Sequence, residues 1–170
     1  QSAAFSEQIV KQMASKVQRP IIMPLSNPTS KCEALPSDVI RWTEGRALVA
    51  AGSPFAPVTY DGNTYQIAQA NNALIFPGLG LGVTVARASR VTDRMLAAAA
   101  DAVAALSDAT TVGASLLPSV EQLRMVSAAV GVAVAQAADS EGMAQADLGN
   151  LVQQIHQAMW RPAYPKIELA

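Results

Sequence analysis

The sequence is poor in chemically reactive side chains. Its 170 residues include one cysteine, Cys32, and one histidine, His156. A single cysteine excludes an internal disulfide and favours a free thiol in a reducing compartment. One histidine and scattered acidic residues offer neither a metal cluster nor a Ser/His/Asp triad. Charged residues make up 15% of the chain and the net charge is −1, so no basic surface indicates nucleic acid or an anionic membrane as a partner.

Long hydrophobic runs and export signals are also missing. Hydrophobic residues make up 51% of the chain, yet no run approaches the roughly 18 apolar residues of a membrane-spanning helix. The N-terminus lacks the basic-then-apolar pattern of a signal peptide. We therefore expect a cytoplasmic protein without a membrane or nucleic-acid partner.

The first 70 residues alternate between helical and strand-like patterns. Ser6 is suited to cap the first helix, and two short apolar runs bounded by turn residues are typical of buried parallel strands. We expect helices over residues 6–18 and 36–43, strands over 21–25 and 47–51, and an edge hairpin over 58–67. This alternation predicts an α/β fold with a parallel sheet.

Beyond residue 70 the sequence is helical in character. We expect helices over 72–90 (broken at Pro77), 92–106, 119–138 (opened by a Ser119–Gln122 capping box) and 147–159, then an extended tail over 160–170. The glycines at 78, 80 and 82 lack the spacing and the preceding strand of a dinucleotide fingerprint. We interpret them as sites of close approach between a helix and a neighbouring backbone.

Polar residues follow each predicted strand. Ser26 and Asn27 follow the first, and Gly52 and Ser53 follow the second. Ligands in open α/β sheets bind beyond the carboxyl ends of the strands, and an asparagine amide both donates and accepts hydrogen bonds. Asn-Pro is also an ordinary turn former, so a purely structural role stays open.

A pair of asparagines, Asn71 and Asn72, precedes the first long helical segment. One can cap the helix while the other faces a ligand. The residues alone do not assign those roles.

Several blocks of the sequence resemble the C-terminal half of malic enzymes. They are residues 20–30 (PIIMPLSNPTS), 42–46 (WTEGR), 52–57 (GSPFAP) and 69–82 (QANNALIFPGLGLG). The segments LSNPTSK (residues 25–31) and NNALIFPG (residues 71–78), in this order, are specific to the family, and the bacterial NAD-dependent branch is the most similar. The resemblance implies oxidative decarboxylation of malate to pyruvate and carbon dioxide, with NAD (or NADP) and Mg²⁺ or Mn²⁺.

The resemblance also implies roles for four residues. Asn27 matches a residue that contacts malate near the nicotinamide. Asn71 and Asn72 match a pair of which at least one contacts malate and the nicotinamide end of the cofactor. Ser26 matches a neighbour of the cofactor. The family's catalytic tyrosine and lysine, its metal ligands and its glycine-rich loop are expected before Gln1, so we expect no catalytic or metal-binding residue in this chain and no activity from it alone.

For the organisation of the chain, the resemblance implies a partial Rossmann-like sheet followed by helices. We expect residues 1–90 to form the C-terminal half of the NAD-binding domain. Residues 91–170 are expected to form a helical region packed on it as one compact unit, within a homo-oligomer. The alternatives are a stand-alone nucleotide-binding or interaction module, and half of another 2-hydroxy-acid or amino-acid dehydrogenase.

Overall fold

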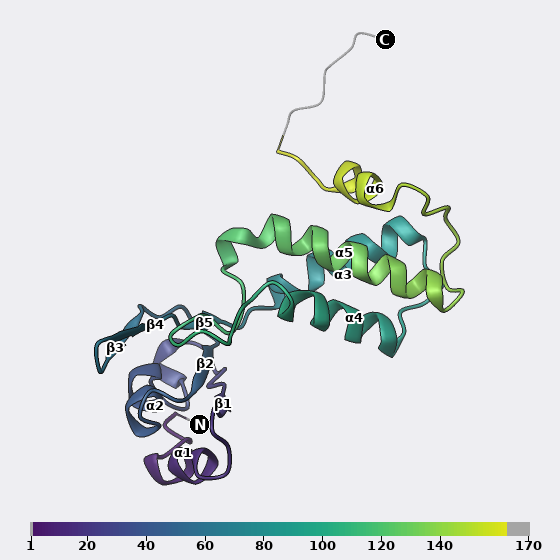
Figure 1. The fold of residues 1–170 in the computed structure, drawn as a ribbon. Coiled ribbons are helices and arrows are strands. Elements are labelled where there is room, and N and C mark those ends of the chain that lie inside the picture. The colour runs from purple at the N-terminus through teal and green to yellow at the C-terminus, as the bar shows by residue number, and fades with distance from the viewer. Residues whose placement is uncertain (1, 163–170) are drawn as a thin grey trace.

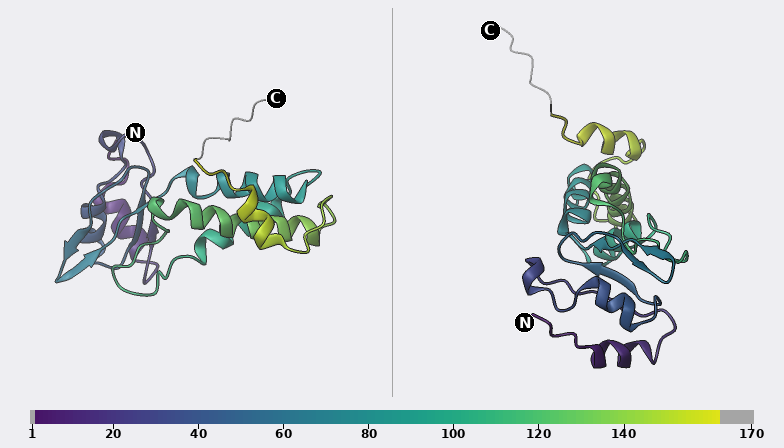
Figure 2. Two further views of the ribbon diagram at one scale, coloured as in Figure 1. Left: turned by 90° about the horizontal axis from the view of Figure 1, so that it is seen from above. Right: turned by 90° about the vertical axis from the view of Figure 1, so that its left-hand side faces the viewer.

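The computed structural model describes residues 2–162. Strands and short helices of the N-terminal part form one end of the molecule, and longer helices form the other (Figures 1 and 2). The predicted tail over residues 160–170 falls largely on residues 163–170, which lie outside the described residues. The observed fold is the α/β class that the sequence predicts.

A parallel sheet carries the N-terminal part. Its strands β1 (Ile21–Ile22), β2 (Leu48–Ala51) and β5 (Ala68–Gln69) lie in the order β1-β2-β5. Both pairs of neighbouring strands run parallel, so the predicted pairing of the two apolar runs is confirmed. Strand β5 was not predicted, because two residues form no apolar run that a sequence pattern can detect.

The predicted hairpin forms from β3 (Val58–Tyr60) and β4 (Asn63–Tyr65), which pair antiparallel. Asp61 and Gly62 connect them with φ values of 48° and 74°, the left-handed pair that a two-residue type I′ turn requires. Our placement of this hairpin at the edge of the parallel sheet is wrong. Among residues 2–162 its strands pair only with each other, and β5 occupies the position beside β2.

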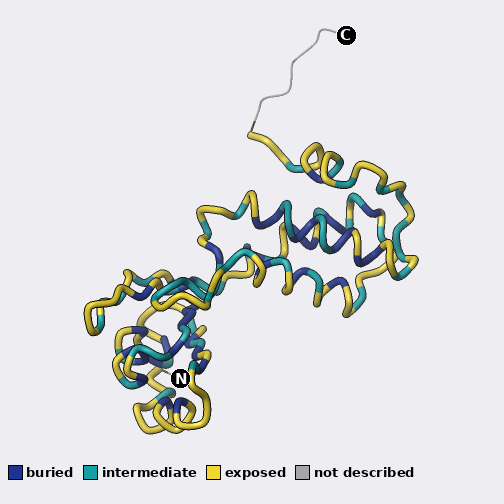
Figure 3. Tube along the Cα trace, in the orientation of Figure 1, coloured by how far each residue is buried: buried dark blue, intermediate teal, exposed yellow. Residues whose placement is uncertain are grey.

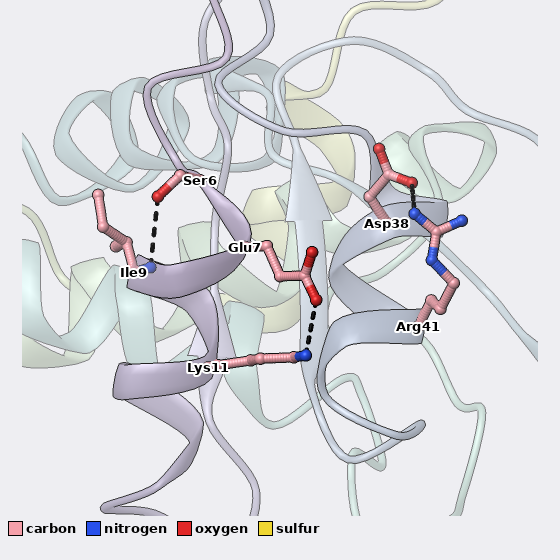
Figure 4. Close-up of polar contacts among 6 residues, drawn as sticks. All are labelled: Ser6, Glu7, Ile9, Lys11, Asp38 and Arg41. Atoms are coloured by element: carbon pink, nitrogen blue, oxygen red, sulfur yellow. Dashed lines mark hydrogen bonds and ion pairs between the residues drawn. The ribbon is translucent and has the colours of Figure 1, made fainter.

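The short helices α1 (Glu7–Ala14) and α2 (Pro36–Trp42) begin where the sequence predicts. The Ser6 hydroxyl oxygen accepts a hydrogen bond from the N–H of Ile9 at 3.4 Å, which caps α1 (Figure 4). Exposed ion pairs join Lys11 to Glu7 and Arg41 to Asp38, at 2.6 and 2.7 Å (Figure 4). Such pairs contribute only about 0.3–0.5 kcal/mol each, so burial holds these helices in place.

A hydrophobic cluster joins α1 and α2 to the strands. Its buried members are Val10, Ile22, Ala34, Val39, Ile40, Ala47, Val49 and Tyr65. Within this cluster the strands are packed by α1 and α2, rather than by helices of the C-terminal half as we expected.

The C-terminal part consists of helices, of which the first three are longer than α1 and α2 and the last is as short as α1. They are α3 (Phe76–Ala86), α4 (Asp93–Ala104), α5 (Leu123–Ser140) and α6 (Leu151–Ala158), with 3₁₀ turns η1 (Thr29–Lys31), η2 (Asn72–Leu74) and η3 (Val120–Gln122) elsewhere in the chain. The sequence predicted a helix break at Pro77, but Pro77 does not break a helix. It lies in the first turn of α3, where its missing N–H leaves no partner unsatisfied.

Two predicted helix starts differ from those observed. Ser119 accepts a hydrogen bond from the N–H of Glu121 and so caps the turn η3, after which α5 begins. Helix α6 begins at Leu151 and not at residue 147, because Asp147 accepts from the N–H of Gly149 and holds a turn before the helix. The Thr92 cap of α4 is confirmed by its hydrogen bond from the N–H of Met95.

A further core lies among α3, α4 and α5, where the buried stripes of these helices face one another (Figure 3). Gly78 and Gly82 in α3 approach α5 closely. A Cβ on Gly78 would lie 2.5 Å from the Val130 Cβ, and one on Gly82 would lie 2.6 Å from the carbonyl oxygen of Gly131. The predicted role of these two glycines is confirmed, whereas Gly80 faces open space.

Helix α3 belongs to this helical core, although it precedes residue 90. The expected division of the chain into two regions, residues 1–90 and 91–170, stays a prediction. Nowhere in residues 2–162 is there a helix with the length and apolarity that crossing a membrane demands.

Candidate functional site

The carboxyl ends of β1, β2 and β5 meet at one edge of the sheet. The N–H of Gly52 donates to the carbonyl oxygen of Pro24 at 3.2 Å, and the N–H of Ala70 donates to that of Ala51 at 2.9 Å. These bonds continue the parallel ladders past the strands and align the loops that follow. Ser26 and Asn27, Gly52 and Ser53, and Asn71 and Asn72 therefore all lie along this edge.

Asn27 is tied to the neighbouring loop. Its Oδ1 accepts a hydrogen bond from the Ser53 hydroxyl at 2.5 Å. Gly52 makes the close approach possible, because a Cβ there would lie 2.0 Å from the Leu25 carbonyl oxygen and 3.1 Å from the Asn27 Nδ2. The exposed Asn27 side chain is thus held over the end of the middle strand.

Ser26 is occupied by Glu33. Its hydroxyl donates to Glu33 Oε1 at 2.5 Å, and its N–H donates to Glu33 Oε2 at 3.1 Å. The hydroxyl bond is the main reason that the pKa of Glu33 is lowered, and the bond from the Ser26 N–H adds to it. Since its proton faces Glu33, the Ser26 hydroxyl has only its lone pairs left for a ligand.

Asn71 and Asn72 lie at the end of β5, and both are exposed. The Asn71 Oδ1 accepts from the N–H of Ala73 at 2.9 Å and caps the turn η2. Among residues 2–162 no hydrogen bond engages the Asn71 amide NH₂ or the side chain of Asn72, so both can meet a ligand.

A pocket of about 310 Å³ opens beside this asparagine pair. Its wall combines the ends of β1 and β5 with apolar residues of α4 and the following loop: Leu25, Ala70, Asn71, Asn72, Leu74, Ile75, Ala100, Val103, Ala104 and Leu117. The mixture of an apolar wall with a few amides is typical of small-molecule sites. Neither Ser26 nor Asn27 is part of this wall.

The two asparagine loops face each other across the middle strand. Strands β1 and β5 flank β2, which separates them by two strand spacings, about 10 Å. Within the described part of the chain, no hydrogen bond joins Asn27 to Asn71 or Asn72. The edge therefore holds separate hydrogen-bonding groups with room between them.

Metal binding does not fit the described residues. Among residues 2–162, no group of three or more His, Cys, Asp or Glu side chains is placed to hold an ion. His156 lies on α6 in an apolar groove of about 860 Å³ between α5 and α6, on a different element from the asparagine loops. The site thus offers amides and hydroxyls, which bind and orient a ligand.

Two residues that complete this site were not predicted as contacts. The Ser53 loop could be placed from its position after β2, but its bond to Asn27 depends on the pairing of two strands far apart in sequence. Glu33 carries no sequence signal of its role, because η1 must first fold it back towards Ser26.

Comparison with known proteins identifies the family to which the chain and this candidate site belong. The family model described as "Malic enzyme, NAD binding domain" matches residues 1–139. This chain belongs to the malic enzyme family. It is 54% identical over 166 residues to NAD-dependent malic enzyme 3 of Bacillus subtilis and 51% identical over 161 residues to a putative NAD malate oxidoreductase of Mycobacterium tuberculosis.

These relatives are much longer than the chain. The alignments cover 98% and 95% of this malic enzyme chain but only 29% of each relative. The described fold is similar to the crystal structure of a malic enzyme from Pyrococcus horikoshii, with a TM-score of 0.72, 28% identity, and coverage of 93% of this chain and 33% of that one. The family assignment argues against half of another type of dehydrogenase.

Proposed function

We propose that this chain works within a longer NAD-dependent malic enzyme, where it binds malate and the nicotinamide end of NAD for oxidative decarboxylation to pyruvate and carbon dioxide. The observation that carries this proposal is the meeting of Asn27, Asn71 and Asn72 at the carboxyl edge of a parallel sheet in a chain of this family. Relatives with about half of their residues identical carry the name NAD-dependent malic enzyme.

The proposed roles follow from the free hydrogen-bonding groups. Asn27 Nδ2 donates to a carboxylate or hydroxyl oxygen of malate, since its Oδ1 already accepts from Ser53. Asn71 and Asn72 contact malate and the nicotinamide carboxamide from the far side of β2. The Ser26 backbone and lone pairs lie beside the cofactor.

The bound NAD would accept the hydride from malate, and this chain's side chains would orient the substrate for that transfer. We assign the acid–base pair and the Mg²⁺ or Mn²⁺ ligands to other parts of the longer enzyme, because the described residues hold no ligand set. We further propose a cytoplasmic homo-oligomer that prefers NAD to NADP.

Steady-state kinetics of the full-length enzyme test the proposal. Asn27→Ala should remove about one hydrogen bond to a charged group, worth roughly 1.5–3 kcal/mol. This corresponds to about a ten- to hundred-fold loss in kcat/KM for malate, with a smaller effect on the KM for NAD. Asn72→Ala should behave similarly, because its side chain has no structural partner among the described residues.

Asn63→Ala supplies a matched control. Asn63 is also an exposed asparagine, but it lies in the β3–β4 hairpin, where its amide donates to the Asp61 carbonyl oxygen. Its removal should leave malate kinetics unchanged. Wild-type kcat/KM in a folded Asn27→Ala enzyme would refute the substrate role of this edge.

A further inference from the structure

We infer that Ser53 is a positioning residue that presents the amide NH₂ of Asn27 to the substrate and thereby selects an acceptor group, such as a carboxylate oxygen. The inference rests on the proposed function of the Asn27 loop. The inference gives the loop after β2 a role in substrate recognition, although Ser53 in that loop need not touch the substrate.

The observed hydrogen bond leaves the donating end of the Asn27 amide available. A carboxamide has one accepting and one donating end, and rotation by half a turn exchanges them. In the structure the Ser53 hydroxyl donates to Oδ1 at 2.5 Å. The rotated amide would instead donate from its NH₂ to the Ser53 hydroxyl oxygen. It would also turn its carbonyl oxygen outwards, where that oxygen would repel a carboxylate, so a carboxylate ligand favours the observed orientation.

Burial ties the Ser53 hydroxyl to Asn27. Ser53 is only 8% exposed, so water cannot readily replace Asn27 as the partner of its hydroxyl, and leaving a buried hydroxyl without a partner is unfavourable. Asn27 itself is exposed. The pair therefore consists of a buried anchor and an exposed recognition group.

The Asn27 donor lies beside Gly52. A Cβ at this position would lie 3.1 Å from Asn27 Nδ2, so the NH₂ group lies over the end of β2, the middle strand. That position is between the β1 loop and the loop that carries Asn71 and Asn72. The donor is thus placed at the centre of the proposed site.

A double-mutant cycle in the full-length enzyme tests the inference. Ser53→Ala should lower kcat/KM for malate about three- to ten-fold, as expected for one neutral hydrogen bond. In the Asn27→Ala background the same substitution should have no further effect, because it acts only through the amide. A purely structural role of Ser53 would lower activity equally in both backgrounds.

Two further variants examine the direction of the amide. Asn27→Asp keeps an oxygen for Ser53 but replaces the donor with a second oxygen, so kcat/KM should fall below that of Asn27→Ala. Ser53→Thr retains the hydroxyl and should restore most of the activity lost in Ser53→Ala. If Asn27→Asp is as active as the wild type, the donor role is wrong.

Ser127→Ala is the matched control, since Ser127 is as buried as Ser53, at 7% exposed, but lies on α5. It should leave malate kinetics unchanged. If circular dichroism shows that Ser53→Ala does not fold, Ser53→Cys replaces it in the cycle, because a thiol is a weaker donor of similar shape.

The outcomes separate this inference from the proposed function. If Asn27→Ala has wild-type malate kinetics, the substrate role of the edge fails and the inference fails with it. If Asn27→Ala is impaired while Ser53→Ala is fully active, or if the two effects add, only the positioning role of Ser53 is overturned.

Discussion

Replacement of Gly78 by alanine should destabilise the chain, although alanine is the better helix former. A Cβ at Gly78 would lie 2.5 Å from the Val130 Cβ and 2.8 Å from the Ser127 carbonyl oxygen. Carbon atoms in contact prefer about 3.5–4.0 Å, so α3 and α5 would have to separate by about 1 Å. Overpacking of this kind costs about 1–3 kcal/mol.

The helix propensity gained by alanine, about 0.5–1 kcal/mol, offsets only part of this cost. We expect a net loss of about 1–2 kcal/mol in the free energy of unfolding, which lowers Tm by about 2–8 °C for a chain of this size. Urea and thermal unfolding of the 170-residue chain, followed by circular dichroism, measure the loss.

Gly80→Ala is the control within the same helix. Apart from its chain neighbours and the backbone of its own helix, no atom lies within 4 Å of a Cβ at Gly80. This substitution should therefore raise the free energy of unfolding by about 0.5–1 kcal/mol. The two substitutions should therefore change stability in opposite directions. Equal effects of Gly78→Ala and Gly80→Ala would refute the close packing of α3 on α5.

Further predictions concern activity, acid stability and association. The purified 170-residue chain should reduce neither NAD nor NADP with malate, with or without Mg²⁺ or Mn²⁺; turnover proportional to its concentration would contradict this. Because the Ser26 hydrogen bond holds the pKa of Glu33 below its ordinary value of 4.5, the stabilisation is present above that pH and is lost as the pH falls through the lowered pKa. Ser26→Ala should thus lower the free energy of unfolding by about 1 kcal/mol near pH 7 and by less near pH 3. Strand β1 lies at the sheet edge with Ile21 56% exposed, so light scattering should detect self-association of the isolated chain, and monomer alone at high concentration would count against it.

Local patterns in the sequence were sufficient to place most elements. The sequence was sufficient to predict the Ser6 and Thr92 caps and the two apolar strands. A cap bond spans three residues, and a buried strand is a contiguous apolar run, so both are local patterns. Strand β5 could not be read, since Ala68 and Gln69 become a strand only by pairing with β2. Formation of β5 therefore depends on tertiary contacts.

The candidate site shows the same division between local and distant information. The asparagine loops could be predicted from their positions after strands and from the family resemblance. The Asn71 cap of η2 involves a residue two positions away and was foreseen as an alternative. The bond between Asn27 and Ser53 spans 26 residues, so it depends on the register between β1 and β2, which no local pattern specifies.

A crystal structure of the full-length enzyme with NAD and an unreactive malate analogue tests the central claim most directly. The account predicts a carboxylate or hydroxyl oxygen of the analogue at about 2.7–3.2 Å from Asn27 Nδ2, with the Asn27 Oδ1 still accepting from Ser53. Asn71 or Asn72 should contact the analogue or the nicotinamide from the β5 side. An analogue bound away from this edge, or an Asn27 amide turned with its oxygen towards the carboxylate, would contradict the account.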